Sequence, residues 1–350
     1  MPRKRQEPKG AVKTSLFAHL DREEHINRLG DTLQEIDQLI DFKALSQSLE
    51  PLVGRVESPK GGRPAYPTEL MLRIVVLKHL YGLSDEQTEY QLLDRLSFQR
   101  FTGLRNARNV PDRTTIWLFH ERLGEEGSRT LFDEIKRQIS AQGFIARGGQ
   151  MIDASLVQAP KQRFSKEEKA SLEKGEVPQQ WRPAKGAQKD IEATWTKKHG
   201  KSYFGYKLHV GADARGKFIR TVSVTTASES DTRHMESVLD SANTSKDLYA
   251  DRGYVDGARE ERLIEEGFRP NIQRKAQVNK PLSATQKGRN ERIAKTRARI
   301  EHVLGAMHWM GAHYIRTIGL PRAKTQLTLK SAVYNIRRLV SVQRVGLEAF

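Results

Sequence analysis

Apolar residues recur every three or four positions through the first 145 residues, with turn-rich breaks between the runs. This spacing puts apolar side chains on one face of a helix and predicts an all-α region. Capping residues and glycines set the expected ends of the helices. Helices are expected at about 30–50, from the cap Thr68 to Gly82, from the capping-box pair Ser84 and Gln87, after the cap Asp112, and at about 127–141.

The helical region is rich in arginine, and its short helices are joined by tight polar turns. This pattern suits a helix-turn-helix-like DNA reader, and it suits an ordinary helical bundle equally well. Residues 1–15 are basic and predict a tail. We therefore expect a basic tail at 1–15 and a helical DNA-binding domain at 16–145.

The pattern changes at Gln150, where short β-type runs alternate with helical segments. QMIDASLVQA predicts a strand, YFGYKLHVGAD and IRTVSVTTAS a hairpin, and DLYADRGY and FRPNIQR two further strands. Helices are expected at DTRHMESVLDSA, at DGAREERLIEEG, and at about 286–310 and 322–343. Residues 160–200 lack periodicity and predict a long loop. The order indicates an α/β fold, a mixed sheet flanked by helices, over 146–350.

Composition restricts the chemistry of the chain. Its 350 residues include no cysteine, which excludes disulfides, thiol catalysis and cysteine-bound zinc. No apolar run has membrane-spanning length and the N-terminus has no signal-peptide core, so we expect a cytoplasmic protein without membrane contact. The net charge of +17 favours polyanionic partners. Ten basic residues against one acid lie between Arg269 and Arg299, as a solvated linker or as a phosphate-binding approach to the next helix.

Three acidic residues stand at positions where carboxylates are unusual. Asp153 lies inside an apolar strand, where an unpaired charge is costly. Asp251 lies at a strand end, where α/β sheets present functional groups, and Glu301 borders an apolar helix face. Carboxylates without cysteine or a histidine cage favour Mg²⁺ or Mn²⁺. Each acid alone also has a structural explanation, as a strand-end acid, a turn former, or an ion-pair partner of Arg297 one helical turn away.

Longer strings around these acids are similar to a known protein family. MIDASLV, YFGYKLHVGAD, LYADRGY and RARIEHVLG resemble the catalytic core of DDE transposases of bacterial insertion sequences. The best agreement is with the family named after insertion sequence five, in the superfamily named after insertion sequence four. The leader GRPAYPTELMLRIVVLKHLYG and the tail IRTIGLPRAKTQLTLKSAVYNIRRLV resemble it too. The resemblance is weakest over 1–30 and 160–200, and it implies a ribonuclease-H-like catalytic domain at 146–350.

The resemblance also implies roles for individual residues. Asp153, Asp251 and Glu301 would be the catalytic acids, binding two Mg²⁺ ions that Mn²⁺ can replace. Related families add a Tyr, an Arg and a Lys around the Glu. Arg297 matches that Arg, whereas Ala294 and His308 stand at the Tyr and Lys positions. The expected DNA contacts are Arg297, Arg299, His302, His308, Lys207, Arg252, Arg292 and Lys295.

Five other residues have competing interpretations. Lys207 and His209 share one strand face, which indicates a solvated face more than a DNA groove. Asp231 is expected as a helix cap, with an auxiliary acid as the alternative. Tyr254 is a packed aromatic or a base-stacking ring, and Trp309 is expected in the core.

The function implied by the resemblance is transposition. The enzyme would bind terminal inverted repeats, cleave phosphodiesters at the element ends and join the 3′-hydroxyls to target double-stranded DNA. It would act as a homodimer or larger homo-oligomer at the bacterial nucleoid, without ATP, since the chain has no GxxxxGK[ST] phosphate loop. The alternatives are a catalytically silent DNA-binding regulator, a ribonuclease-H-fold nuclease without strand transfer, and a recombinase with a Tyr or Ser nucleophile.

Overall fold

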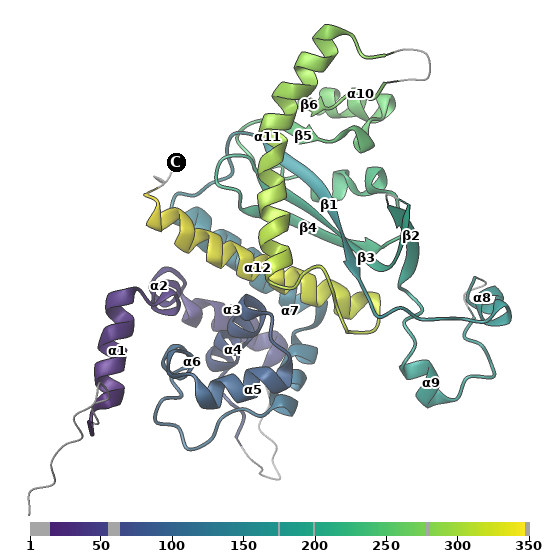
Figure 1. The fold of residues 1–350 in the computed structure, drawn as a ribbon. Helices are drawn as coiled ribbons and strands as arrows, with labels where there is room; N and C mark the ends of the chain where they lie inside the picture. Colours follow the sequence, from purple (N-terminus) through teal and green to yellow (C-terminus); the bar gives the residue numbers. More distant parts are fainter. Residues whose placement is uncertain (1–14, 55–63, 174–175, 199, 277–280, 347–350) are drawn as a thin grey trace, which may run out of the picture.

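The structure, a computed structural model, describes residues 15–54, 64–173, 176–198, 200–276 and 281–346. The expected tail at 1–15 lies almost entirely outside these ranges. The described chain forms a set of helices and a mixed sheet, the α/β arrangement that the sequence predicts (Figure 1). None of its helices combines the length and apolar character that a membrane crossing needs, within the ranges given above.

The N-terminal part is helical, as its periodicity predicts. Asp112 accepts a hydrogen bond from the Thr115 amide, and Ser84 and Gln87 form the expected capping box. Gly82 ends its helix in the left-handed conformation, with φ of 64°. The helices are α1 (Ala18–Leu29), α2 (Thr32–Leu39), α3 (Phe42–Val53), α4 (Thr68–Tyr81), α5 (Asp85–Asp94), α6 (Leu96–Thr102) and α7 (Arg113–Ala141).

Four details of this helical part differ from the prediction. The helix expected at 30–50 is two helices, because Ile40 is extended and Asp41 caps α3. Thr68 is the first residue of α4 and not its cap, since Pro67 precedes it and no side chain caps the helix. The segment at 127–141 is the second half of α7, which is kinked at Gly124. Helices α1 and α6 lie outside the predicted helices.

The sheet is mixed, with β1 at its centre. Strand β1 runs antiparallel to β3 and parallel to β5, and β5 runs parallel to β6. The order is β2-β3-β1-β5-β6, with β4 also paired to β3 as the second half of the predicted hairpin. This mixed sheet with helices on it confirms the predicted α/β class. The strands are β1 (Gln150–Gln158), β2 (Thr194–Lys198), β3 (Lys201–Asp213), β4 (Ile219–Thr226), β5 (Asp247–Ala250) and β6 (Arg269–Ile272).

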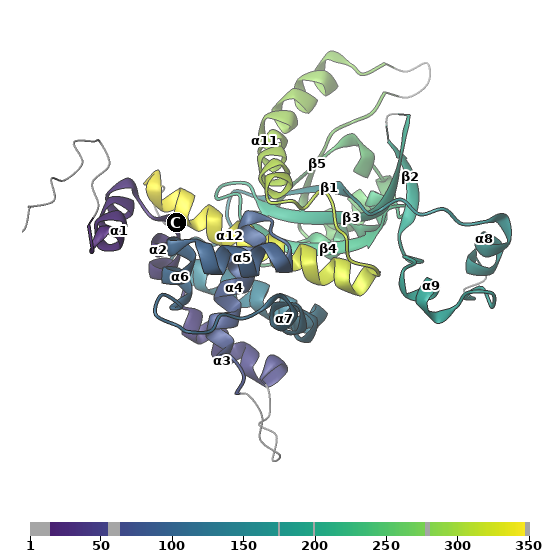
Figure 2. The same cartoon turned by 60° about the horizontal axis from the view of Figure 1, so that its bottom comes forward.

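Two segments between the strands differ from the prediction. Residues 160–200 contain α8 (Lys166–Glu173), α9 (Pro183–Ala187) and β2. Helices α8 and α9 extend away from the rest of the molecule, whereas β2 pairs with β3 in the sheet (Figures 1 and 2). The rings of Phe164 and Trp181 stack with centroids 6.1 Å apart, so this segment has contacts of its own. The helix expected at Asp231 is two 3₁₀ turns, η1 (Asp231–His234) and η2 (Glu236–Val238).

The remaining helices cover the sheet on both faces. Neighbouring residues Met151 and Ile152 of β1 belong to two separate apolar clusters, because successive strand side chains point to opposite faces. A short turn η3 (Arg252–Tyr254) follows β5, and α10 (Gly257–Glu265) leads to β6. The long helix α11 (Ala284–Trp309) packs on β1, and α12 (Leu320–Arg344) packs on β4 and α7. Figures 1 and 2 show α12 between the N-terminal helices and the sheet.

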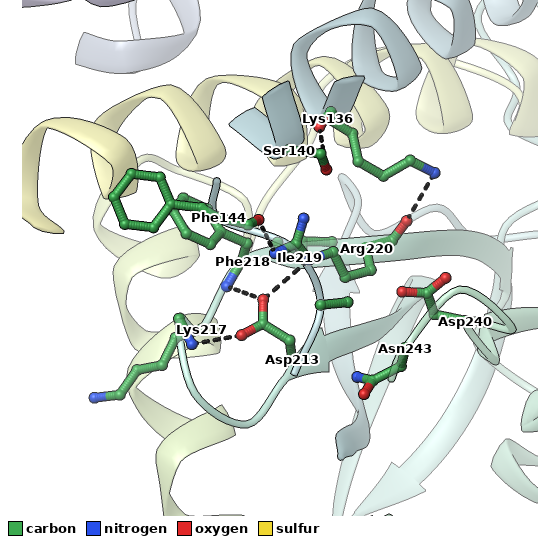
Figure 3. A network of polar contacts seen from close by, with 12 residues as sticks. Lys136, Ser140, Phe144, Asp213, Lys217, Phe218, Ile219, Arg220, Asp240 and Asn243 are labelled. Carbon is green, nitrogen blue, oxygen red and sulfur yellow. Dashed lines mark hydrogen bonds and ion pairs between the residues drawn. The ribbon is translucent and has the colours of Figure 1, made fainter. Parts of the chain in front are cut away.

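A buried ion pair joins the β3–β4 turn to the end of the helical part (Figure 3). The Arg220 Nε atom donates to the Asp213 carboxylate at 3.0 Å, and both side chains are almost fully buried. A second Arg220 nitrogen donates to the Phe144 carbonyl at 2.7 Å. Asp213 also accepts from the amides of Gly216 and Phe218. This network therefore fixes where the first sheet strand begins after α7.

Candidate active site

Asp153 within β1 and Asp251 directly after β5 lie close to each other. Strands β1 and β5 are parallel, with Met151 opposite Tyr249. Continuing this register by two residues places Asp153 opposite Asp251, and neighbouring strands lie roughly 4.8 Å apart. Asp251 follows β5 and accepts a hydrogen bond from the Gly253 amide at 2.7 Å. The first two expected acids therefore come together where β5 ends beside the middle of β1.

Glu301 reaches this pair of acids through Arg297. One Arg297 nitrogen lies 3.0 Å from the Asp153 carboxylate and the other 3.4 Å from the Glu301 carboxylate. Arg297 and Glu301 are four residues apart on α11, so they share a helix face above β1. The Glu301 side chain is 65% exposed, which leaves it free to turn toward the aspartates. The ion pair considered for Glu301 is therefore present, and it includes Asp153.

Burial makes this site electrostatically unusual. Burial raises the pKa of Asp153, and the nearby Asp251 carboxylate raises it further, while the Ala154 amide and Arg297 oppose the shift. Tyr254 is buried with its hydroxyl unpaired among the described residues. Burial and the surrounding carboxylates, Asp153 first, raise the pKa of Tyr254. The site thus holds crowded negative charge and a neutral hydroxyl, conditions that a bound cation would relieve.

The donor set fits a hard divalent cation. The two adjacent aspartates and the exposed Glu301 offer carboxylate oxygens alone, and Asp153 carries a pKa raised toward the neutral form, which a cation would reverse. Within the described ranges, no three His, Asp or Glu side chains already stand in a metal-binding arrangement. Arg297 supplies the positive charge between Asp153 and Glu301 instead. Asp153 and Asp251 are consequently the pre-arranged pair, and Glu301 would have to turn toward them to share a cation with them.

Ser155 joins this site, although the sequence interpretation did not single it out. The Ser155 hydroxyl lies 2.9 Å from Nε2 of His308, which is on the same helix as Arg297. Burial and the neighbouring His313 lower the pKa of His308. Because side chains two apart on a strand share a face, Ser155 could have been found from its spacing to Asp153. Helix α11 is therefore attached to β1 at two points along one face.

The face that carries Lys207 and His209 is covered, contrary to the solvated face expected for it. Lys207 pairs with Asp231 at 2.8 Å, and its side chain is 13% exposed. His209 is buried against Thr225, and burial lowers its pKa to about 4. Asp231 caps no helix here but begins η1 as the partner of Lys207. Lys207 borders a small cavity of about 180 Å³ together with Ser155 and Lys198.

One of the other expected DNA contacts is held inside the molecule. Arg299 does not join the acids, because its guanidinium donates to the Ala214 carbonyl at 2.8 Å, near the start of β1. The remaining four are exposed and form no ion pairs with other described residues: Arg252, Arg292, Lys295 and His302.

Trp309 was expected in the core. It is 90% exposed, because it ends α11 on the side away from the buried residues.

The mixed sheet with helices and the two close aspartates are the features of an α/β enzyme, and comparisons with known proteins give its family. A family model described as "Transposase DDE domain" matches residues 146–336, and one described as "Transposase domain (DUF772)" matches residues 20–122. The chain therefore belongs to the DDE transposase family. It is a DDE-type transposase, an enzyme of a class that acts on DNA with divalent metal ions.

One solved structure is similar over most of the chain. It is the "Cryo-EM structure of piggyBac transposase synaptic complex with hairpin DNA (SNHP)". The match has 12% sequence identity and a TM-score of 0.44, and it covers 91% of this chain and 77% of that chain. At this level of similarity the assignment to the family rests on the two sequence matches.

Proposed function

We propose that this transposase cleaves phosphodiesters at the ends of its element and joins the 3′-hydroxyls to target DNA, with Asp153, Asp251 and Glu301 as its catalytic acids. The observation that carries the proposal is the register of β1 and β5, which sets Asp153 beside Asp251 with Arg297 linking Glu301 to them. The strings around these acids favour the insertion-sequence-five family and a bacterial nucleoid location. The helical region would bind the terminal inverted repeats, and a homodimer or larger homo-oligomer would pair two ends.

The three acids are the residues that would hold Mg²⁺ ions, or Mn²⁺ in their place. Such ions, when bound, make a water or a 3′-hydroxyl nucleophilic and stabilise the leaving oxygen of a phosphodiester. The protein positions the reactants: β1 and β5 fix the two aspartates, and α11 carries Glu301 on a side chain that is free to turn. Arg297 lies within reach of two acids and supplies the positive charge that a phosphate group needs beside them.

The surrounding cations would hold the DNA backbone. Lys198 borders the small cavity next to Ser155, and its charge lowers the pKa of Asp153, so a phosphate beside Asp153 would meet this ammonium group. Lys207, another expected DNA contact, is already paired with Asp231. Arg252, Arg292, Lys295 and His302 are exposed and available for further phosphate contacts. We expect His308 to act mainly through Ser155 and Arg299 through the Ala214 carbonyl, as residues that position α11.

The experiment combines labelled terminal-repeat DNA, a target plasmid, Mg²⁺ and the full-length chain. We expect joined strand-transfer products from the wild type, and at least about 100-fold less product from Asp153→Asn with unchanged duplex binding. The matched control is Asp247→Asn, which changes an acid on β5 that pairs with exposed Arg269 and should keep full activity.

Each other outcome assigns a different function. Cleavage without joined products means a nuclease, and binding without cleavage means a regulator. A covalent protein–DNA adduct formed without metal means a Tyr or Ser recombinase. Wild-type activity of Asp153→Asn would remove the three acids from the mechanism.

A further inference from the structure

A large cavity lies where the helical part meets the end of the catalytic sheet. Its volume is about 900 Å³, and its walls come from the α4–α5 turn, α5, α7, the segment after α11, and α12. Ligand pockets span roughly 300–1,000 Å³, so this one has room for one or two nucleotides but not for a DNA duplex. The three proposed catalytic acids do not line this cavity, so it is separate from the proposed catalytic site.

Three aromatic rings line the cavity from three different elements. Tyr90 of α5 is 63% exposed, Trp117 of α7 is 45% exposed, and Tyr314 in the segment after α11 is 38% exposed. Large aromatic side chains usually bury their apolar surface, so three exposed rings around one hollow need an explanation. Every nucleobase has a flat π-face that stacks on such rings, whatever its sequence.

The same cavity has uncompensated positive charge. The lining acids Asp85 and Glu121 are already paired, with Lys78 at 2.5 Å and with Arg322 at 2.7 Å. Lys330 is 3% exposed, and its ammonium group donates to the Met310 carbonyl with no carboxylate partner in the described chain. Burial lowers the pKa of Lys330 to about 8, with the charge of nearby Lys78 contributing.

Arg316 adds an exposed cation to the cavity. It is exposed, and its guanidinium forms no ion pair with any residue that the structure describes. Glu86, the remaining acid of the lining, is directed toward exposed Arg113 at 3.7 Å. Exposed aromatic rings combined with free cations are the combination by which proteins bind single-stranded DNA, and a neutral small molecule would not require the cations.

The cavity is connected to the catalytic strand. The His313 carbonyl accepts from the Gln158 amide at 2.9 Å, and the Ile315 amide donates to the Gln158 carbonyl at 2.9 Å. Gln158 is the last residue of β1, five residues beyond Asp153, and a strand rises about 3.3 Å per residue. The cavity wall therefore begins roughly 17 Å from the acids, a distance that a few nucleotides of one strand can span.

We propose that this cavity binds unpaired nucleotides of the DNA substrate, with bases stacked on Tyr90, Trp117 and Tyr314 and phosphates bound by Arg316. The proposal rests on the proposed function only in that the substrate is DNA. The position of the cavity relative to Asp153 predicts that the bound DNA strand separates from its complementary strand within a few nucleotides of the phosphodiester held at Asp153.

The test is the affinity of the full-length chain for a short fluorescein-labelled oligothymidylate, measured by fluorescence anisotropy. Replacing Trp117→Ala or Tyr314→Ala should weaken binding about tenfold or more, since each stacked base contributes strongly to affinity. Arg316→Ala should weaken oligothymidylate binding as well. Because one phosphate contact is lost, the affinity of this variant should fall less steeply with rising salt than that of the wild type. Affinity for a blunt duplex of the same length should stay within about twofold in all three variants.

The matched control is Leu118→Ala. Leu118 is the neighbour of Trp117 on α7 and is equally exposed, at 47%, but it does not line the cavity. It should bind oligothymidylate like the wild type. Arg316 is exposed and unpaired, so Arg316→Ala keeps the test decisive if an aromatic variant does not fold.

Two results would overturn the proposal. Wild-type oligothymidylate affinity in Arg316→Ala and in the folded aromatic variants would show that the cavity does not hold single-stranded DNA. A change of the chain from dimer to monomer in Trp117→Ala, without loss of oligothymidylate affinity, would make the cavity a protein interface. Neither result depends on catalysis, because Asp153→Asn should bind oligothymidylate normally whether or not the acids perform cleavage.

Discussion

Two histidines, His79 of α4 and His120 of α7, are buried against each other at the junction with α12. Their Nε2 atoms are 3.2 Å apart, so one ring must donate a proton and the other must accept it. Burial lowers the pKa of both groups, that of His120 to about 3, and the charges of Lys78 and Lys330 add to the effect. Both imidazoles are therefore neutral at pH 7 in the folded chain.

This pair makes stability depend on pH in a predictable direction. Below pH 6.5 the unfolded chain binds protons on these histidines that the folded chain excludes, so stability falls as pH falls toward 3. For His120 alone the loss between pH 7 and pH 5 is on the order of 2 kcal/mol. Thermal unfolding of His120→Gln should therefore depend less on pH over this range. Exposed His25→Gln is the control and should keep the wild-type slope, whereas equal slopes for all three chains would contradict the prediction.

At the residue scale, the acids could be predicted and their surroundings could not. Asp153 among apolar residues and Asp251 at a strand end follow from the sequence pattern, and the register of β1 and β5 agrees with that expectation. The partner of a side chain depends on packing between distant segments, so neither the Ser155–His308 contact nor the Lys207–Asp231 pair was predicted. Trp309 was predicted wrongly because an apolar residue at a helix end can face solvent.

At the scale of elements, long periodic segments with caps were predictable. The bounds of α11 and α12 agree with the expected 286–310 and 322–343 within two residues. Short or irregular elements were not, since their structure depends on tertiary contacts. The 3₁₀ turns at 231–238 have too few turns to show a helical period. Strand β2 was missed because it is mostly exposed, with a polar sequence, and becomes a strand by pairing with β3.

The buried ion pair of Arg220 and Asp213 should contribute more to the free energy of unfolding than an exposed ion pair does. Replacing Arg220→Met leaves the Asp213 carboxylate buried without its partner and should cost about 3–5 kcal/mol of the free energy of unfolding. The control is Arg269→Met, which breaks a pair with Asp247 whose arginine is 67% exposed and should cost less than about 1 kcal/mol. Urea unfolding of both variants measures the difference. Equal losses would mean that the β3–β4 turn does not depend on this pair.

The whole molecule is organised around α12. In this helix 15 of 25 residues are buried, because it packs on α7 along one side and on β4 along the other. The Asn335 side chain donates to the Ile219 carbonyl and accepts from the Ile219 amide, both at 2.8 Å, which joins α12 to the start of β4. At its end, Arg344 pairs with Glu35 of the helical part at 2.6 Å. The apolar residues of α7, α12 and β4 accordingly form one continuous cluster.

This shared helix predicts that the helical part and the sheet unfold together. Opening α12 exposes apolar faces of both parts at once, so amides in α7 and in β4 should exchange with free energies of opening within about 1 kcal/mol of each other. Hydrogen exchange followed by mass spectrometry on the full-length chain measures both values. Asn335→Ala removes the link to β4 from inside the shared helix and should lower both values together. Arg344→Ala removes only a half-exposed ion pair and should change neither by more than about 1 kcal/mol. If α7 stayed protected while β4 exchanged freely in Asn335→Ala, the helical part and the sheet would be independent folding units. A cavity between two such units could not keep a fixed shape for a DNA strand.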